Sequence, residues 1–585
     1  MEESLNQHHF ILPALILGFL FLRSFNPVCA QEGATSVAAK DRPDVRHNAD
    51  TLRQFNEFGS YGLFINGIHA GLHGGSAGLQ TTYSYRNFNG YREHSNDYSH
   101  NFDLGYQTSP SENTSLQILG HYTGGVLKRP GSLTKTEFEQ DPFLADPRAV
   151  NRDEKRITQK GDVEIRFEDH FGESQEQRIE ISGTGQIEYF VRSAKEYKIT
   201  TRYIVGLTAR YVNEEKLWNH GSEFTLGGTL LHQPERKEEY ENFGGQQSDQ
   251  LEQIEVEKTS MASCYFSENY NLIGKKLNIL LGGKYDHVIY SVAEETQPAR
   301  SDTKRFRAFT PDISLKYKII PAVTIQATWE MKFRNPTDRE LESPDPAYLY
   351  NQDLKSQTTN TLKASLKGDL VKNRRSLFLK SWVADATISV SQIENEIVRY
   401  EILGDEYFRN AGITNRFRLN FHTRLEIISN LNLSAGYSFS HYVYQSYITQ
   451  SWEEDVTGNI VKLNRDFSGS TEPNIPVNSL NLALAYQHQV WETCSISAKI
   501  SYARLGGLWV DDANSEKTAA SNLMNVFAGF NMKFGRFICN ISGGVSNLFN
   551  QVYVVTANMN SADRRFYNAG SPRDFNGSVN FGYTF

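Results

Sequence analysis

The stretch VTIQATWEMKFR, Val323–Arg334, alternates apolar and polar side chains without a break. Its apolar positions are Val323, Ile325, Ala327, Trp329, Met331 and Phe333. A period of two predicts a β-strand with one dry face and one wet face. The stretch would span about 40 Å, which exceeds the usual strand of a soluble sandwich and is enough to cross a bilayer at the tilt of a barrel strand.

The same alternation recurs along the chain, at residues 313–319 and 431–439 and in the closing segment NGSVNFGYTF, residues 576–585. The pattern alone fits a soluble sheet, or a membrane barrel whose dry face meets lipid and whose wet face lines a polar lumen. The length of these strands, and the charges on their polar sides, favour the barrel. A soluble secreted β-protein remains the alternative.

The predicted connections are unequal in length. Short turns are expected at residues 273–275 and 318–322, and long polar stretches at residues 128–155, 233–258, 335–357, 449–472, 511–521 and 556–572. Short periplasmic turns and long extracellular loops are typical of outer-membrane barrels. The sequence therefore predicts an all-β fold, a single transmembrane antiparallel β-barrel of about 22 strands over residues 59–585.

The N-terminus predicts export. Residues 9–22 form an apolar run of signal-peptide length, and Val28 and Ala30 supply the small residues that a signal peptidase requires. We expect a signal peptide over residues 1–30, followed by a short periplasmic segment over residues 31–58. The alternative is an uncleaved anchor, because the first residues carry Glu2 and Glu3 and no basic residue.

Composition and motifs exclude several functions. The net charge of −8, with 22% charged residues and no basic block, argues against a nucleic-acid partner. We find no HExxH, GxSxG, P-loop or CxxC motif. We therefore expect no enzyme activity, no cofactor and no resident metal. The 35 Phe and 30 Tyr residues would suit aromatic girdles at the two membrane boundaries.

Several strings resemble the barrel domain of TonB-dependent outer-membrane receptors, which import ferric siderophores and other scarce nutrients. They are GYREHS (90–95), RPGSLT (129–134), GGKYD (282–286), FTP (309–311), FRNP (333–336), NQDLK (351–355), DDAN (511–514), NLFN (547–550) and GSPR (570–573). The resemblance covers residues 60–585. It implies a location in the Gram-negative outer membrane, contact with its lipid, and uptake of a solute such as a ferric siderophore or another metal chelate.

The resemblance also implies recognition of the closing strand by the barrel assembly machinery. The residues expected to carry that signal are Val579, Phe581, Tyr583 and Phe585. We expect the strand over residues 59–71 to pair with this closing strand across the seam of the barrel.

The sequence departs from the family at its N-terminal end, where members carry a globular plug and a TonB-contacting segment. We expect no plug in residues 31–58. A separate plug-bearing chain and TonB are then candidate partners. The alternatives are a truncated or rearranged gene, a passive or partner-gated channel, and a structural barrel in an outer-membrane complex.

Receptors of this family hold anionic chelates with basic side chains of the extracellular loops, because guanidinium groups match carboxylates. The resemblance therefore implies a small-molecule chelate site in the first long loop, with a solvated charged loop as the alternative. The candidates are Lys128, Arg129, Arg148, Arg152 and Arg156, together with His94 from the preceding loop.

Overall fold

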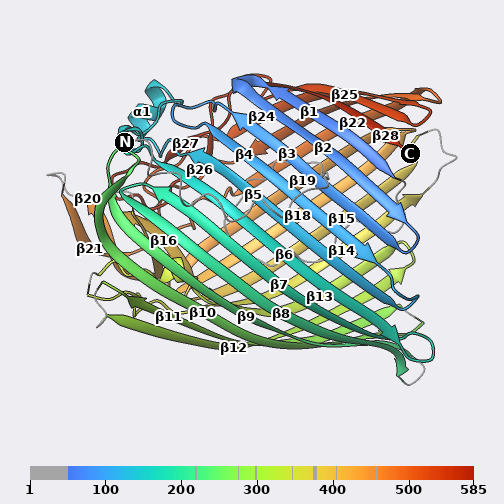
Figure 1. Ribbon diagram of the computed structural model, residues 1–585, viewed down its shortest axis with the longest axis horizontal. Helices are drawn as coiled ribbons and strands as arrows, with labels where there is room; N and C mark the ends of the chain where they lie inside the picture. Colours follow the sequence, from blue (N-terminus) through green and yellow to red (C-terminus); the bar gives the residue numbers. More distant parts are fainter. Residues whose placement is uncertain are drawn as a thin grey trace.

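The computed structural model describes residues 50–217, 220–274, 276–296, 300–345, 347–372, 378–402, 405–454 and 459–585. The predicted signal peptide, residues 1–30, lies outside the described residues. The described chain forms one closed sheet of 22 strands, in which each strand pairs antiparallel with the next (Figure 1). The prediction of a barrel of about 22 strands is confirmed.

The barrel strands are β1 (Thr51–Gly59), β2 (Leu63–Gly74), β3 (Ala77–Phe88), β4 (Asp97–Thr108), β5 (Thr114–Lys128), β6 (Lys155–Phe171), β7 (Gln177–Ser193), β8 (Glu196–Leu217), β9 (His220–Asn242), β10 (Gln247–Leu272), β11 (Leu277–Glu294), β12 (Ser301–Ile320), β13 (Val323–Arg334), β14 (Gln357–Lys372), β15 (Ser381–Glu394), β18 (Ile413–Ile428), β19 (Leu431–Ser446), β22 (Asn478–Trp491), β23 (Cys494–Leu505), β24 (Ser521–Phe534), β25 (Phe537–Ser546) and β28 (Asp574–Thr584).

The seam of the barrel differs from the prediction. β28 pairs with β1, from Thr51 opposite Thr584 to Gly59 opposite Asn576. The first strand therefore begins at Thr51 rather than near residue 59, and the strand predicted at 59–71 is β2, one place further from the seam. The sequence TLRQFNEFG does not predict this strand, because polar Gln54 and Asn56 share a face with Leu52 and Phe58 and interrupt the apolar stripe.

Apolar side chains face outward from the barrel wall. On β13, Ile325 and Trp329 are 44% and 38% exposed, whereas the polar residues between them are half-buried toward the lumen. An exposed apolar exterior is what a membrane barrel requires, because lipid covers it. Among the described residues, no helix is long and apolar enough to cross a membrane.

The two ends of the barrel differ. At the end near the C-terminus the connections are short turns, for example the residue pairs 321–322, 429–430 and 535–536 (Figure 1). The opposite end, here the loop end, carries three added hairpins and three short helices. They are β16–β17 (Ile397–Ile402 and Asp405–Asn410), β20–β21 (Ile448–Glu454 and Ile460–Asp466), β26–β27 (Val554–Ala557 and Tyr567–Ala569), α1 (Lys135–Gln140), α2 (Pro147–Asn151) and α3 (Asp338–Leu341).

One predicted loop is wrong. Residues 233–258 are mostly strand, because β9 and β10 extend far beyond the apolar band and turn only at residues 243–246. The stretch is charged on both faces, with Glu235 and Lys237 on one and Arg236 and Glu238 on the other. A strand without an apolar face carries no sequence signal of its own.

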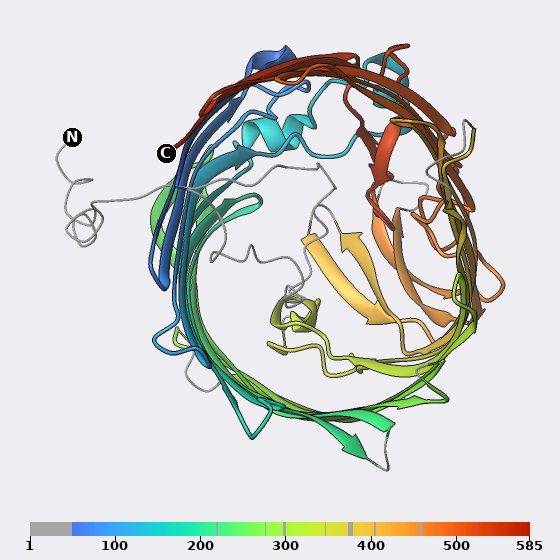
Figure 2. The ribbon, with the colours of Figure 1, turned by 90° about the vertical axis from the view of Figure 1, so that its right-hand side faces the viewer.

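The loops fold inward and contain the apolar cores of the molecule. The β16–β17 hairpin lies inside the ring of barrel strands (Figure 2). Three apolar clusters hold the loop end together, and the third of them comprises Val398, Ala411, Tyr444, Tyr447 and Phe467. The described part of the lumen is therefore narrowed by ordered loops at this end.

Candidate functional site

A cavity of about 370 Å³ lies at the loop end and is lined by basic side chains. We call it the arginine pocket, and its basic residues are Arg129, Arg148, Arg152, Arg192, Lys195, Arg399 and Arg565. Four carboxylates also line it, those of Asp146, Glu154, Glu401 and Glu406. The residues come from the first long loop, the β7–β8 turn, the β16–β17 hairpin and the last long loop.

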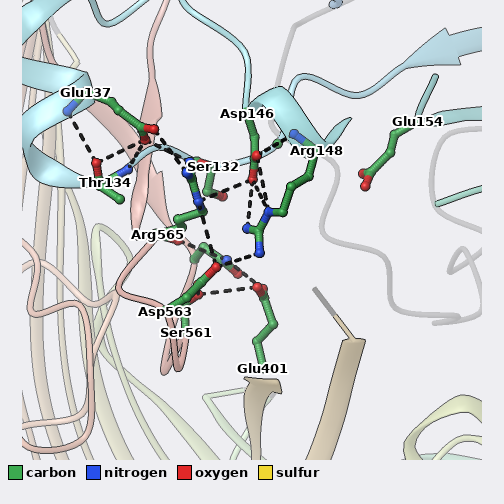
Figure 3. A network of polar contacts seen from close by, with 12 residues as sticks. Ser132, Thr134, Glu137, Asp146, Arg148, Glu154, Glu401, Ser561, Asp563 and Arg565 are labelled. Atoms are coloured by element: carbon green, nitrogen blue, oxygen red, sulfur yellow. Dashed lines mark hydrogen bonds and ion pairs between the residues drawn. The ribbon is translucent and has the colours of Figure 1, made fainter. Parts of the chain in front are cut away.

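The start of helix α2 positions the Arg148 side chain. Asp146 caps α2 by accepting a hydrogen bond from the Arg148 backbone N–H, and Pro147 is suited to the first helical position. The Arg148 guanidinium donates back to the Asp146 carboxylate, with 2.8 Å between Nη2 and Oδ2, and lies 2.7 Å from Asp563 (Figure 3). This arginine is thus a fixed part of the pocket wall.

Arg565 joins the last loop to the first one. Its guanidinium donates two hydrogen bonds to the Glu137 carboxylate, at 2.8 and 3.0 Å, and lies 3.5 Å from Asp146 (Figure 3). Glu137 also closes a capping box with Thr134 at the start of α1. Burial opposes ionisation, but the hydrogen bonds and charges of these partners hold the pKa of Glu137 and of Asp146 below their ordinary values.

The β16–β17 hairpin forms the inner wall of the pocket. Arg399 donates from Nη2 to Asn558 Oδ1 at 2.7 Å, the same nitrogen lies 2.6 Å from Glu406 Oε1 within the hairpin, and the Arg399 Nε is buried without an acceptor among the described residues. Lys195, on the barrel wall, lies 2.9 Å from Asp405 of the same hairpin. The hairpin is therefore joined to the barrel wall by the ion pair of Lys195 with Asp405 and to the last long loop by the hydrogen bond from Arg399 to Asn558.

Arg192 is different from these paired cations. Its guanidinium makes no hydrogen bond or ion pair with any other described residue. In the strand register it lies between Arg156 of β6 and Lys198 of β8, so three cations stand side by side on the lumen face. Like charges directly opposite one another in a sheet are destabilising. Glu196 and Glu239 compensate Lys198. The charges of Glu154 and Glu406 act on Arg192 from a greater distance, so an anion in the pocket would add to this compensation.

A second cavity of about 350 Å³ adjoins the first and shares Arg192, Ala194, Lys195 and Glu406 with it. It lies between the β16–β17 hairpin and strands β8–β10, with Arg339 and Glu342 contributed by the α3 segment. The two cavities form a continuous polar space on both sides of Lys195.

Three of the six predicted ligand residues meet in the arginine pocket, namely Arg129, Arg148 and Arg152. The other three lie outside its lining. Lys128 lies 2.9 Å from Asp153, and His94 Nε2 lies 3.0 Å from the carbonyl oxygen of Glu154. The Arg156 guanidinium lies over the Phe190 ring, 5.3 Å from its centroid. For these six residues, ligand contact stays a prediction.

Sequence reasoning missed Arg192, Lys195, Arg399 and Arg565. Arg565 lies in a stretch predicted as a loop, and Arg399 lies in a hairpin beyond the end of β15. Arg192 lies at the end of β7, and Lys195 lies in the two-residue turn that follows, which is too short to be predicted as a loop. What brings the four residues together is the inward fold of the loops.

Among the described residues, one group of carboxylates has the spacing of a metal site. Oxygens of Glu235, Glu257 and Asp338 lie within 4.8 Å of one another beside the second cavity. Burial raises the pKa of Glu257 to about 8, although the charge of Lys237 lowers it. Sequence reasoning missed this group, because its members are 22 and 81 residues apart.

The expected assembly residues lie along the seam. Phe581 and Phe585 are 53% and 58% exposed on the outer face. The Tyr583 ring lies 5.0 Å from Phe585 and 4.7 Å from Phe537, and Val579 stands opposite Ile541. Their recognition by an assembly machinery stays a prediction.

Several outer-membrane proteins of known structure have the same fold as this chain. The ferric citrate transporter FecA in its unliganded form superposes with a TM-score of 0.73 at 14% identity, over 92% of this chain and 79% of that one. BauA, the ferric preacinetobactin receptor from Acinetobacter baumannii, has a TM-score of 0.71 at 13% identity, over 92% and 80%. The copper transporter OprC has a TM-score of 0.70 at 13% identity, over 93% and 81%.

The family model for the TonB-dependent receptor-like β-barrel matches residues 40–548. Its members are transport receptors rather than enzymes, and the expected resemblance is confirmed over most of the chain. The chain belongs to the TonB-dependent receptor-like β-barrel family and is a barrel of the Gram-negative outer membrane.

Proposed function

We propose that this barrel takes up a small anionic metal chelate, such as a ferric siderophore or ferric citrate, and that it first binds the chelate in the arginine pocket. The observation that carries the proposal is Arg192, whose guanidinium makes no hydrogen bond or contact ion pair with any described residue and which is held in register between Arg156 and Lys198. A guanidinium group in this setting favours a carboxylate or a similar oxyanion.

The size of the space supports a small ligand. Pockets of about 300–1,000 Å³ are typical for small molecules. The two adjoining cavities, at about 370 and 350 Å³, fall within this range separately and together. The structural neighbours support the same proposal, since they include a ferric citrate transporter and the ferric preacinetobactin receptor BauA.

The second candidate is a passive or partner-gated channel, or a structural barrel. The reason to consider it is that every described residue from Thr51 onward belongs to the barrel wall or to its connections. A separate plug-bearing chain and TonB would be the partners of a gated form. The two candidates differ in whether the loop end has measurable affinity for a chelate.

Binding of ferric citrate to the detergent-solubilised chain tests the proposal. We expect saturable binding that Arg192→Gln weakens by about tenfold or more, because a hydrogen bond to a charged group contributes about 1.5–3 kcal/mol. Isothermal titration calorimetry measures both affinities, with a neutral hydroxamate chelate of iron as the comparison ligand.

Arg178→Gln is the matched control, since Arg178 lies on the same strand at the other end and pairs with Glu180 at 3.1 Å. It should leave the affinity unchanged. Equal affinity of the wild type and Arg192→Gln, or tighter binding of the neutral chelate, would refute the arginine pocket as the binding site.

A further inference from the structure

Three carboxylates converge where the α3 segment meets the barrel wall. Glu235 of β9, Glu257 of β10 and Asp338 at the start of α3 bring oxygens within 4.8 Å of one another. Glu235 and Glu257 are only 3% and 2% exposed. We call this group the carboxylate cluster. At the same height along the barrel, the outer face carries the ion pair of Arg236 with Glu238 in place of apolar side chains. The carboxylate cluster therefore lies beyond the apolar band.

The cluster is only partly neutralised. Arg202 donates to Glu235 Oε2 at 2.5 Å and lies 3.6 Å from Asp338, and Lys237 donates to Glu257 Oε1 at 2.9 Å. Two further oxygens of the cluster, Glu235 Oε1 and Glu257 Oε2, are buried and have no hydrogen-bond partner among the described residues. Leaving a buried charged acceptor without a partner costs more than the few kcal/mol typical of a neutral group.

A separate residue points to the same place. Tyr350 is 1% exposed, and its hydroxyl makes no hydrogen bond with any described residue. Tyr350 packs in one apolar cluster with Leu341 of the α3 segment, and the charges of Glu257, Lys237, Asp338 and Glu255 act on its hydroxyl. Tyr350 belongs to an apolar cluster with Val288 and Leu341 that shields the site from bulk water.

We propose that the carboxylate cluster binds one Ca²⁺ ion, with the carboxylates of Glu235, Glu257 and Asp338 as ligands and the Tyr350 hydroxyl beside them. The donor atoms are all oxygen, which suits a hard cation and not a soft transition metal. Three carboxylates from three separate elements favour Ca²⁺ over Mg²⁺, since Mg²⁺ needs a near-ideal octahedron and retains most of its water.

A bound cation would hold the α3 segment in place against the barrel wall. Asp338 directly precedes Arg339, and Arg339, Glu342 and Tyr348 line the second cavity. A cation that joins Asp338 to β9 and β10 would fix this wall of the cavity. Extracellular Ca²⁺ would then order the loop end without entering the arginine pocket. The site does not depend on the proposed chelate transport.

Calorimetric titration of the full chain in detergent, after removal of bound cations with EGTA, tests the site. We expect one Ca²⁺ per chain with a Kd between about 10⁻⁴ and 10⁻³ M, the range of extracellular calcium modules, and clearly weaker binding of Mg²⁺. Glu257→Gln and Asp338→Asn should each weaken Ca²⁺ binding by at least about tenfold, since changes to outer-shell partners alone have effects of this size. Glu180→Gln, a change to a paired carboxylate on another strand, should not.

Tb³⁺ luminescence provides a second readout that does not need a ligand mutation. Tb³⁺ can occupy Ca²⁺ sites and emits when a nearby tyrosine absorbs, so excitation should give emission that Ca²⁺ competes away and that Tyr350→Phe sharply reduces. Absence of saturable Ca²⁺ binding, equal binding by the wild type and both carboxylate variants, or tighter binding of Mg²⁺ would each overturn the proposal. Folding of every variant is checked by its heat-modifiable migration.

Discussion

At the scale of single residues, the basic side chains of the loop end fall into two groups. Arg148 and Arg565 are held by carboxylates at 2.7–3.0 Å and build the wall of the arginine pocket. Arg192 has no such partner among the described residues. The same residue type thus holds the loops in one case and, in our proposal, binds the ligand in the other. The sequence alone could not separate the two, because the partners of Arg148 and Arg565 include residues more than 400 positions away in the chain.

The α1–α2 loop should loosen in acid. The pKa values of Glu137 and Asp146 lie below their ordinary values of 4.5 and 3.8, because their hydrogen bonds and ion pairs outweigh burial. A lowered pKa in the folded state gives stability that is fully present above the ordinary value and is lost as the pH falls through the lowered one. Amide exchange in residues 134–151, taken relative to a barrel-strand peptide at the same pH, should therefore rise as the pH falls below about 4.

Asp146→Asn gives the matched comparison, because the new side chain cannot titrate. Its loop should exchange faster already at neutral pH and respond less to acid. A loop that instead loosens between neutral and alkaline pH would contradict the assignment of its stability to these carboxylates.

At the scale of elements, a buried polar network holds the β16–β17 hairpin in addition to the ion pair of Lys195 with Asp405. Asp512 is fully buried and accepts hydrogen bonds from the hydroxyls of Tyr444 and Tyr447, at 2.9 and 3.1 Å, and from Arg409 at 3.2 Å. Arg409 belongs to β17, and its guanidinium also lies over the rings of Tyr400 and Tyr447. The network connects the hairpin to the loops after β19 and β23.

Asp512→Ala should release the hairpin from the barrel wall. Removing one partner of a buried ion pair costs about 3–5 kcal/mol, because the other charge is left without compensation. We expect amide exchange in residues 397–402 and 405–410 to accelerate by about a hundredfold or more, at 1.4 kcal/mol per factor of ten. Mass spectrometry of hairpin peptides measures the change.

Tyr444→Phe removes a single hydrogen bond and should have a small effect, since such a bond contributes about 0.5–1.5 kcal/mol. The barrel strands should keep their protection in both variants. Unchanged hairpin exchange in Asp512→Ala would show that the network does not hold the hairpin.

The sequence predicted elements well where one face is apolar and poorly where both are polar. β13 has the predicted bounds, Val323–Arg334, because its apolar stripe is unbroken. The sequence predicts a loop for the outer halves of β9 and β10, since their charges occupy both faces. β1 was missed because backbone pairing with β2 and β28, rather than an apolar stripe, defines it.

At the scale of the whole molecule, a lipid-covered wall of 22 strands carries a loop end that folds into its own lumen (Figure 2). The wall could be predicted because a period of two is local information. The arginine pocket could be predicted only in part, for Arg129, Arg148 and Arg152, because its other residues meet through the packing of loops distant in the sequence. The division of the chain before residue 50 stays a prediction.

The central claim is that a chelate binds at the loop end of this barrel, inside the lumen. Ion current through single purified barrels in a planar bilayer tests it most directly, with ferric citrate added to the side that the loop end faces. The account predicts a current that falls with increasing ferric citrate until it saturates, with Arg192→Gln shifting the response to about tenfold higher concentration. A large, constant current that ferric citrate does not change in either protein would contradict it.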